Sequence, residues 1–331
     1  MLNKYKIMGK QQYILLTLLI VLMCTSCTTS KKEEYTRLEG FVFGTTYHIT
    51  YKSTVDYQEP INTIFKKFNN SLSTYIPNSI ISKINKGDTT VVVDDYFVEA
   101  FDKAKRIYKE TDGYFDPTIG KLIDAYGFGS GKEQKNLTEE EIEELMKSKG
   151  FDEVILKDRR IQKPNNIEFN VNAFAKGLGI DVVGRFLEEN KIQDYLVEIG
   201  GEIRAKGKSP RGKLWKVAID DPNTDGTRST SKFIILDNQS MATSGNYRKF
   251  KINTNGEKIV HTVNPKTGLA QESKLLSVSV ASVKDCADVD AYATAFLAMG
   301  LEKTKNFIAK KPSLKVVLLY AEEGEIKEFS N

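Results

Sequence analysis

The sequence predicts an α+β fold, a single large domain in which mixed or antiparallel sheets are packed by helices. Strand and helix patterns alternate irregularly along the 331 residues, and few of them form clean strand–helix–strand units. Asn255-Gly256 lies between two alternating runs, which is a strong signal for an antiparallel hairpin. Gly177 and Gly179 form no Gly-x-Gly-x-x-Gly fingerprint, and no Lys-Ser or Lys-Thr pair follows them directly. The common nucleotide-binding folds built on parallel sheets are therefore disfavoured.

The N-terminus carries an export signal. Three lysines and no acidic residue precede an apolar stretch from Tyr13 to Met23, which is too short to span a bilayer. We therefore expect residues 1–26 to be a secretory signal peptide. Ser26 before Cys27 resembles the lipobox of bacterial lipoproteins, so Cys27 is the predicted lipidated residue and residues 27–37 the tether. The protein is expected to be exported and anchored to a membrane by this lipid, facing the periplasm.

Composition limits the partners and the cross-links. Removing the three signal lysines from the 48 basic residues leaves 45, against 44 acidic residues, so net charge does not support a nucleic-acid partner. Cys286 is the only cysteine beyond the predicted anchor, which excludes an intramolecular disulfide in the mature chain. The remaining roughly 300 residues are long enough to bury a large core. Residues 38–331 are the predicted domain.

In the N-terminal half, apolar spacing predicts the elements. Leu38 to Tyr51 alternates as a strand that Gly44 interrupts, and such a glycine marks a bulge or the close approach of a ligand. Two amphipathic helices follow. The apolar face of the first runs from Ile61 to Phe68, and that of the second from Phe97 to Tyr108. A capping box at Thr138–Glu141 opens a short acidic helix.

The C-terminal half is richer in strands. Apolar runs predict strands at residues 154–157, 167–171, 195–199, 215–219, 233–236, 277–282 and, as the last one, 314–320. The small residues of Ser240 to Asn246 predict a loop. One helix is expected from about Ala175, and another is expected to be capped by Asp285 and to end at Gly300.

The stretch from Ile167 to Val183 suggests an anion site. A predicted strand leads into a helix through a small-residue turn that carries Lys176, followed by Gly177 and Gly179. A helix that begins in this way directs free backbone N–H groups at a ligand, and Lys176 adds a positive charge suited to phosphate. On this stretch alone, an ordinary first-turn lysine beside glycines that allow close packing explains the pattern at least as well.

Asp290 and Thr294 are candidates for a metal site. They lie four residues apart and so share one face of the predicted helix. A carboxylate beside a hydroxyl suits a hard cation such as Mg²⁺. The alternative is an ordinary exposed acid and a threonine that bonds back to its own helix. The many alanines of this helix favour a close approach of Asp290 to other backbone.

Histidine supplies the candidate base. His261 leaves a strand and enters an Asn-Pro-x-Thr-Gly turn, where a side chain is exposed on a rigid support. Its imidazole is the natural general base near neutral pH. His48 lies in the middle of a strand, so a structural role is favoured for it.

Eight short motifs occur in order along the chain. They are Phe43-Gly44-Thr45-Thr46-Tyr47, Ser73-Thr74-Tyr75, Gly113 to Gly120, Ala173-Phe174-Ala175-Lys176-Gly177, Ile199-Gly200-Gly201, Ala242 to Tyr247, His261 to Gly268 and Asp290 to Ala295. Each motif is weak alone, but the ordered set is specific. It resembles the ApbE family, the FAD:protein FMN transferases, over nearly the whole chain from Phe41 to Tyr320.

The resemblance implies an enzyme that binds FAD and Mg²⁺ and transfers FMN to a threonine hydroxyl of a partner protein, releasing AMP. The partner would be a flavoprotein subunit with a threonine-containing flavinylation motif. The FAD-binding residues it implies are Phe43, Tyr75, Tyr114, Phe115, Asp116, Asn170, Lys176 and Thr262. The metal ligands it implies are the carbonyls of Ala173 and Ala293 with the side chains of Asp290 and Thr294, and His261 would lie beside the reacting phosphate.

One departure and two alternatives accompany this resemblance. Asn170 stands where many members carry Asp, which removes a charge from an expected ribose or adenine contact, although Asn still accepts a hydrogen bond. The same site would also support Mg²⁺-dependent hydrolysis of FAD to FMN and AMP, with water as the acceptor. A flavin-binding lipoprotein without turnover is the second alternative. Asp290, Thr294 and His261 speak against it, because simple binding needs neither a base nor a metal.

Overall fold

The computed structural model describes residues 34–129, 136–222, 229–247, 250–252, 256, 258–270 and 272–331. Of these, residues 35–331 form one compact unit. The predicted signal peptide, Cys27 and most of the predicted tether lie outside the described residues, as does Asn255. None of the helices that the described residues form has the length and hydropathy needed to cross a bilayer.

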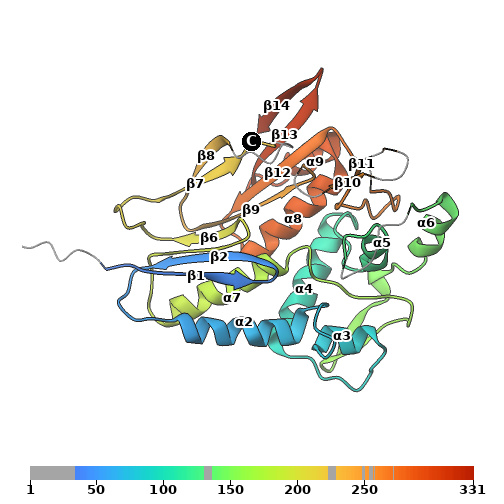
Figure 1. The fold of residues 1–331 in the computed structure, drawn as a ribbon, viewed down its shortest axis with the longest axis horizontal. Helices are drawn as coiled ribbons and strands as arrows, with labels where there is room; N and C mark the ends of the chain where they lie inside the picture. The colour runs from blue at the N-terminus through green and yellow to red at the C-terminus, as the bar shows by residue number, and fades with distance from the viewer. Residues whose placement is uncertain are drawn as a thin grey trace, which may run out of the picture. The chain divides into compact units, whose positions relative to one another are not determined.

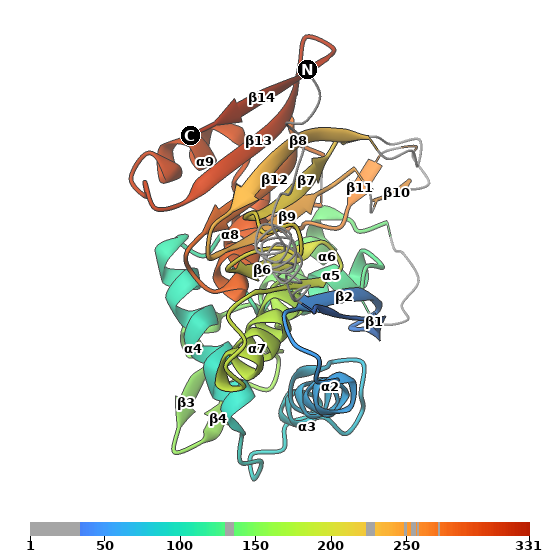
Figure 2. The same ribbon diagram turned by 90° about the vertical axis from the view of Figure 1, so that its left-hand side faces the viewer.

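The unit is built on one sheet of eight strands, in which each neighbouring pair is antiparallel. In spatial order the strands are β1 (Thr36–Val42), β2 (Thr45–Tyr51), β5 (Tyr195–Ile199), β6 (Glu202–Lys206), β9 (Gln239–Gly245), β12 (Leu275–Ser282), β13 (Lys315–Glu322) and β14 (Glu325–Ser330). Figure 2 shows β1–β2 and β13–β14 at opposite ends of this sheet.

Three further antiparallel hairpins lie outside the large sheet. They are β3 (Ile155–Lys157) with β4 (Arg160–Gln162), β7 (Trp215–Asp220) with β8 (Thr230–Leu236), and β10 (Phe250–Ile252) with β11 (Lys258–Val260). The β7–β8 hairpin covers one face of the large sheet, where Trp215, Val217 and Ile219 pack in one apolar cluster with Ile203 and Met241. Alternation of buried and exposed residues along β7 is what a strand with one covered face requires.

Helices cover the other face of the large sheet (Figure 1). The helices are α2 (Gln58–Leu72), α3 (Ile80–Asn85), α4 (Asp95–Glu110), α5 (Gly120–Ala125), α6 (Glu139–Met146), α7 (Ala175–Glu189), α8 (Cys286–Met299) and α9 (Leu301–Ile308), with a 3₁₀ turn at Phe151–Glu153. The helix α7 packs on β5 and β6, α8 packs on β9 and β12, and α2 and α4 form an outer layer against them. The α+β prediction is confirmed, and the described sheets are antiparallel throughout.

The segment from Leu38 to Tyr51 is a hairpin, so its prediction as one interrupted strand was wrong. Val42 pairs with Thr45, and the two residues between them, Phe43 and Gly44, both have positive φ, at 51° and 77°. A two-residue turn of this kind matches the twist of paired strands. Gly44 therefore marks the end of β1 rather than a bulge within a strand.

Two further predictions were wrong: one predicted strand is absent, and one predicted loop is a strand. Residues 167–171 form no strand, although Ile167, Phe169 and Val171 are buried. The side chain of Asn85 pairs with both backbone groups of Phe169, and the carbonyl of Pro117 accepts from the N–H of Asn170. Residues 239–245 form the strand β9 rather than a loop. The small side chains of β9 allow α8 to pack closely on it. Six elements were not predicted, namely α3, α5, β4, β6, α9 and the final strand β14.

Candidate active site

A cavity of about 590 Å³ opens at one end of the large sheet. The first turn of α7 and residues 290–298 of α8 lie beside it. This volume lies in the range typical of ligand-binding pockets. Residues far apart in the sequence form its wall, and most of the predicted site residues are among them. They are Tyr75, Tyr114, Phe115, Asp116, Asn170, Ala173, Lys176, His261, Thr262, Asp290 and Thr294.

Two of the predicted residues do not line this cavity. Phe43 packs its ring on Phe65 and Phe68, with centroids 5.6 and 4.9 Å apart, and lies against Gly179. Ala293 is fully buried within α8, next to Thr294. Phe43 is partly buried, and its contact with a flavin stays a prediction.

The start of α7 combines both explanations that the sequence left open. A Cβ at Gly177 would lie 2.6 Å from the carbonyl oxygen of Cys286, so this glycine allows α7 to touch the backbone of α8. The N–H of Gly177 donates to Asp290 Oδ2 at 3.1 Å and is therefore not free for a ligand. Lys176, one residue earlier, lines the cavity. Gly177 lets the two helices pack, Gly179 makes room for the ring of Phe43, and the lysine supplies the charge.

Asp290 and Thr294 form an oxygen-rich part of the wall. Asp290 is 2% exposed, which excludes the alternative of an ordinary exposed acid. Burial raises the pKa of Asp290, although Lys176 and the N–H of Gly177 act against this. The Thr294 hydroxyl donates to the carbonyl of Ala173 at 3.2 Å, so it does not bond back to its own helix, and Ser244 Oγ lies 3.4 Å from it.

Glu202 is the residue of this wall that the sequence did not reveal. It follows the Gly200-Gly201 turn between β5 and β6, is 5% exposed and places Oε1 3.1 Å from Lys176 Nζ. Its Oε2 is buried and has no hydrogen-bond partner. Burial raises the pKa of Glu202, Lys176 lowers it and Asp290 raises it further. Two buried carboxylates thus share one lysine.

The charge on Lys176 is maintained by these carboxylates. Desolvation disfavours the ammonium form, but Glu202 and Asp290 outweigh it and raise the pKa of Lys176 above its ordinary value. A cation held in this way has a fixed position, because Glu202 comes from the sheet and Asp290 from α8. It is suited to bind an anionic group such as a phosphate.

His261 lies on a braced turn after β11. Its ring meets Phe128 edge-on at a centroid distance of 6.3 Å, and its side chain is partly buried in the cavity wall. The turn beyond it is closed by Asn264, whose carbonyl accepts from Gly268 N and whose side chain accepts from Lys266 N, both near 2.9 Å. His48 is on β2, exposed, and 2.6 Å from Glu198 Oε2.

Aromatic and polar residues form the rest of the wall. Tyr75 is 59% exposed, and the ring of Tyr114 has Lys303 above it at 4.9 Å. Asp116 is buried and accepts from the N–H and the hydroxyl of Thr118, and burial raises its pKa. Asn170 Oδ1 accepts from the N–H of Asn172 at 2.8 Å, so one of its two lone pairs is used within the loop.

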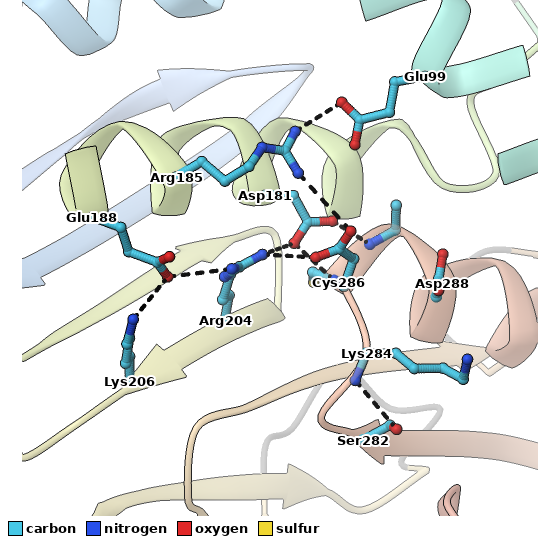
Figure 3. A network of polar contacts seen from close by, with 12 residues as sticks. Glu99, Asp181, Arg185, Glu188, Arg204, Lys206, Ser282, Lys284, Cys286 and Asp288 are labelled. Atoms are coloured by element: carbon cyan, nitrogen blue, oxygen red, sulfur yellow. Dashed lines mark hydrogen bonds and ion pairs between the residues drawn. The ribbon is translucent and has the colours of Figure 1, made fainter. Parts of the chain in front are cut away.

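Behind the wall, a second charged cluster fixes the N-terminus of α8. Asp181 of α7 accepts from the backbone N–H groups of Cys286 and Ala287, each at 2.9 Å. Figure 3 shows Arg204 between Asp181 and Glu188, at 2.8 and 3.3 Å. Asp285 was predicted to cap this helix, but its side chain makes no capping bond and pairs with Lys103 and Arg204 instead.

The fold and this wall define an α+β protein with a cavity whose fixed lysine suits an anionic ligand. Residues 43–318 match the ApbE family, and the chain belongs to that family. Among the described residues, no group of three or more His, Cys, Asp or Glu side chains converges as metal ligands. A metal site here would therefore rest on one carboxylate with hydroxyl and carbonyl oxygens.

Named relatives cover almost the full length of the chain. The FAD:protein FMN transferase of Haemophilus influenzae is 33% identical over 320 residues, 91% of each chain. The protein of the same name from Vibrio cholerae is 29% identical over 327 residues, 96% of each chain. Among solved structures, the flavin transferase ApbE from Vibrio cholerae superposes with a TM-score of 0.80 at 28% identity, covering 90% of this chain and 97% of that one.

Proposed function

We propose that this protein is an FAD:protein FMN transferase. It would move FMN from FAD to a threonine hydroxyl of an acceptor protein in a Mg²⁺-dependent reaction and release AMP. The observation that carries the proposal is the cavity wall in which Lys176, Asp290 and Thr294 lie together, with His261 lining the same cavity. The names of the relatives support the same activity.

The proposed reaction exchanges one phosphorus–oxygen bond for another. The threonine oxygen forms a bond to the phosphorus of the FMN phosphate, and the bond from that phosphorus to the bridging oxygen breaks. AMP leaves with the bridging oxygen and its electron pair. The hydroxyl proton passes to the imidazole of His261, because an unassisted threonine hydroxyl is a weak nucleophile at neutral pH.

Lys176 is proposed to bind the phosphates of FAD. Its ammonium group lies on the cavity wall, and Glu202 holds it at 3.1 Å. A fixed positive charge at this place counters the negative charge that would repel the attacking oxygen and also favours departure of AMP. The N-terminus of α7, which begins at Ala175, adds a partial positive charge of the same sign.

The residues present fit a bound Mg²⁺ ion. Asp290 offers a buried carboxylate, and Thr294 offers a hydroxyl 3.2 Å from the carbonyl of Ala173, all hard oxygen donors. Burial raises the pKa of both Glu202 and Asp290 beside their one lysine, and a bound cation would favour the charged form of Asp290. The carbonyl of Ala293 is the fourth proposed ligand. When bound, the ion would reduce the charge on the phosphate oxygens.

The test is to incubate the purified protein with FAD, Mg²⁺ and an acceptor carrying a threonine in an Asp-Gly-x-Thr-Ser/Ala-Gly-Ala-Thr context. Mass spectrometry of the acceptor should show the addition of FMN at that threonine, and AMP should appear in equal amount. An acceptor in which the threonine is replaced by valine is the matched control. Release of FMN and AMP with no labelled acceptor would establish hydrolysis of FAD instead.

We further propose that the protein is exported and anchored to a membrane through a lipid on Cys27, with residues 27–37 as the tether and residues 38–331 as the enzyme. The lysines and the apolar stretch before Cys27 support this proposal. Cys27→Ala should move the protein from the membrane fraction to the soluble fraction. An unchanged distribution would remove Cys27 as the anchor.

A further inference from the structure

A second hollow, of about 490 Å³, lies next to the cavity. Residues of β2, of the β5–β6 turn, of β7 and of β9 line it, and we call it the β7 groove. Gly200, Thr243 and Tyr247 line both the cavity and the β7 groove, so the two spaces share a wall. The proposed FMN transfer gives no role to the β7 groove.

The shared wall is thin and rigid at the Gly200–Gly201 turn. Both glycines have positive φ, at 61° and 100°. Gly200 N donates to the carbonyl of Thr46 at 3.0 Å, and Gly201 N donates to Glu198 Oε1 at 2.6 Å. A Cβ at position 200 would lie 3.3 Å from Cδ of Lys176, so the turn backbone rests directly on the stem of this lysine. Only the Gly200–Gly201 turn therefore separates the β7 groove from Lys176, whose charge is proposed to bind the phosphates.

One side of the β7 groove is an edge strand. Among the described strands, β7 pairs with β8 alone, and Ala218 and Ile219 of β7 line the groove. The edge of a strand that has no partner presents unpaired backbone N–H and C=O groups to an extended peptide. The opposite side carries the exposed side chains of Thr46 and His48 on β2. Such a groove suits a polypeptide segment with small and polar side chains.

We propose that the β7 groove binds the acceptor protein. An extended segment of the acceptor would lie along β7 and cross the Gly200–Gly201 turn, so that its threonine hydroxyl enters the cavity on the side of Lys176 and His261. This inference rests on the proposed transfer of FMN to a protein. It assigns β2 and β7, which the reaction itself does not use, to recognition of the acceptor.

The test fills the β7 groove without touching the cavity. Ala218→Trp and Thr46→Trp each place a large ring at an exposed position of the groove. We expect the KM for the acceptor protein to rise by about tenfold or more, the effect of losing a well-packed interface contact. The dissociation constant for FAD, measured by calorimetry, should stay within about twofold of wild type, a change within the usual scatter for a distant surface site.

A matched control and a milder variant complete the experiment. Ile326→Trp introduces the same ring at an exposed position of β14, the far edge of the large sheet, and should keep the wild-type KM. His48→Ala removes one groove side chain without adding bulk and tests the inference if either tryptophan variant fails to fold. Its KM should rise as well, by a smaller factor.

The outcomes separate this inference from the proposed function. Wild-type KM for the acceptor in Ala218→Trp, Thr46→Trp and His48→Ala would overturn the β7 groove as the docking site while leaving FMN transfer established. Weaker FAD binding in these variants would also overturn it, because the groove would then act through the cavity. Absence of transfer by the wild-type protein would refute the proposed function, and the acceptor site would fall with it.

Discussion

Two clusters of buried charge lie on the same pair of helices, and they differ in how completely their atoms are paired. In the cluster around Asp181, Arg204 and Asp285, each carboxylate oxygen has a partner at 3.0 Å or less. In the cavity wall, Lys176 faces both Glu202 and Asp290, and Glu202 Oε2 has no hydrogen-bond partner.

This difference separates a structural cluster from a binding site. A buried polar atom without a partner is costly, so a stable fold leaves one only where something else compensates. The Asp181 cluster joins α7 to α8 and is complete without a ligand. The cavity wall has an excess of negative charge beside its one lysine, and a bound cation or an additional proton would relieve it. Five predictions test this contrast, from the largest expected effect to the smallest.

Asp290→Ala should abolish Mg²⁺-dependent FMN transfer while the protein stays folded. Asp290 is the one carboxylate among the proposed metal ligands, and burial raises its pKa, so its charge does not stabilise the fold. The measurement is transfer rate against Mg²⁺ concentration, with circular dichroism to confirm folding. Wild-type activity at ordinary Mg²⁺ would exclude Asp290 as a ligand.

His261→Asn should slow FMN transfer by roughly two to four orders of magnitude, the usual contribution of a general base, and leave FAD affinity nearly unchanged. The turn that carries His261 is closed by Asn264 and does not depend on the imidazole. The pH–rate profile of the wild type should have a rising limb from deprotonation of the base, and that limb should be missing in the variant. Loss of FAD binding would instead make His261 a pocket residue.

Lys176→Ala should weaken FAD binding by about 1–3 kcal/mol, the range for a hydrogen bond to a charged group. It should also lower the free energy of unfolding, because Glu202 and Asp290 would be left buried without their cation. Calorimetry with FAD and urea unfolding measure the two effects separately. The double variant Lys176→Ala with Glu202→Gln should recover part of the stability but not the affinity.

Asp181→Asn should lower the free energy of unfolding by about 1–2 kcal/mol, the cost of losing a helix-capping acceptor. An amide cannot accept from both Cys286 N and Ala287 N. Glu202→Gln is the matched substitution in the cavity wall, and it should change stability less, since its amide oxygen can still accept from Lys176 and the other oxygen has no partner to lose. Equal losses in urea unfolding would remove the proposed distinction between the clusters.

The stability contributed by Asp181 should depend on pH. Burial and the neighbouring Asp285 raise the pKa of Asp181 from 3.8 to about 6, although Arg204 lowers it. The folded protein therefore binds more protons than the unfolded chain in this interval, so the contribution of Asp181 falls as the pH rises from 3.8 to 6. The difference in unfolding free energy between wild type and Asp181→Asn should narrow across this window and stay constant above it. Parallel curves would show that Asp181 does not titrate there.

Sequence patterns predicted the elements whose burial is regular. The helices α2, α4, α7 and α8 and the strands β5, β7, β8, β12 and β13 lie where the periodicity placed them. The pattern failed where tertiary contacts replace local ones. The backbone of Phe169 is satisfied by the side chain of Asn85, which lies 84 residues earlier and which no local rule identifies. In β9, small residues allow a helix to pack closely on a strand, although their composition predicts a loop.

The candidate site was predictable where a side chain carries the chemistry and hidden where the fold does. Lys176, His261, Asp290 and Thr294 stand in recognisable motifs, and the structure brings all four to one cavity. Glu202 follows a Gly-Gly turn and had no local signal beyond a charged residue at the start of a strand. Its importance arises from the approach of β6 to α7, a contact between elements that the sequence alone does not pair.

The contact between Gly177 and the backbone of α8 limits how much the site has to rearrange when a substrate binds. A main-chain contact sets the spacing of Lys176 and Asp290, because no side chain fits between the two helices there. Backbone held by packed helices moves less than surface rotamers do. The cation and the carboxylate are therefore preorganised, so little reorganisation energy has to be supplied when an anionic substrate arrives.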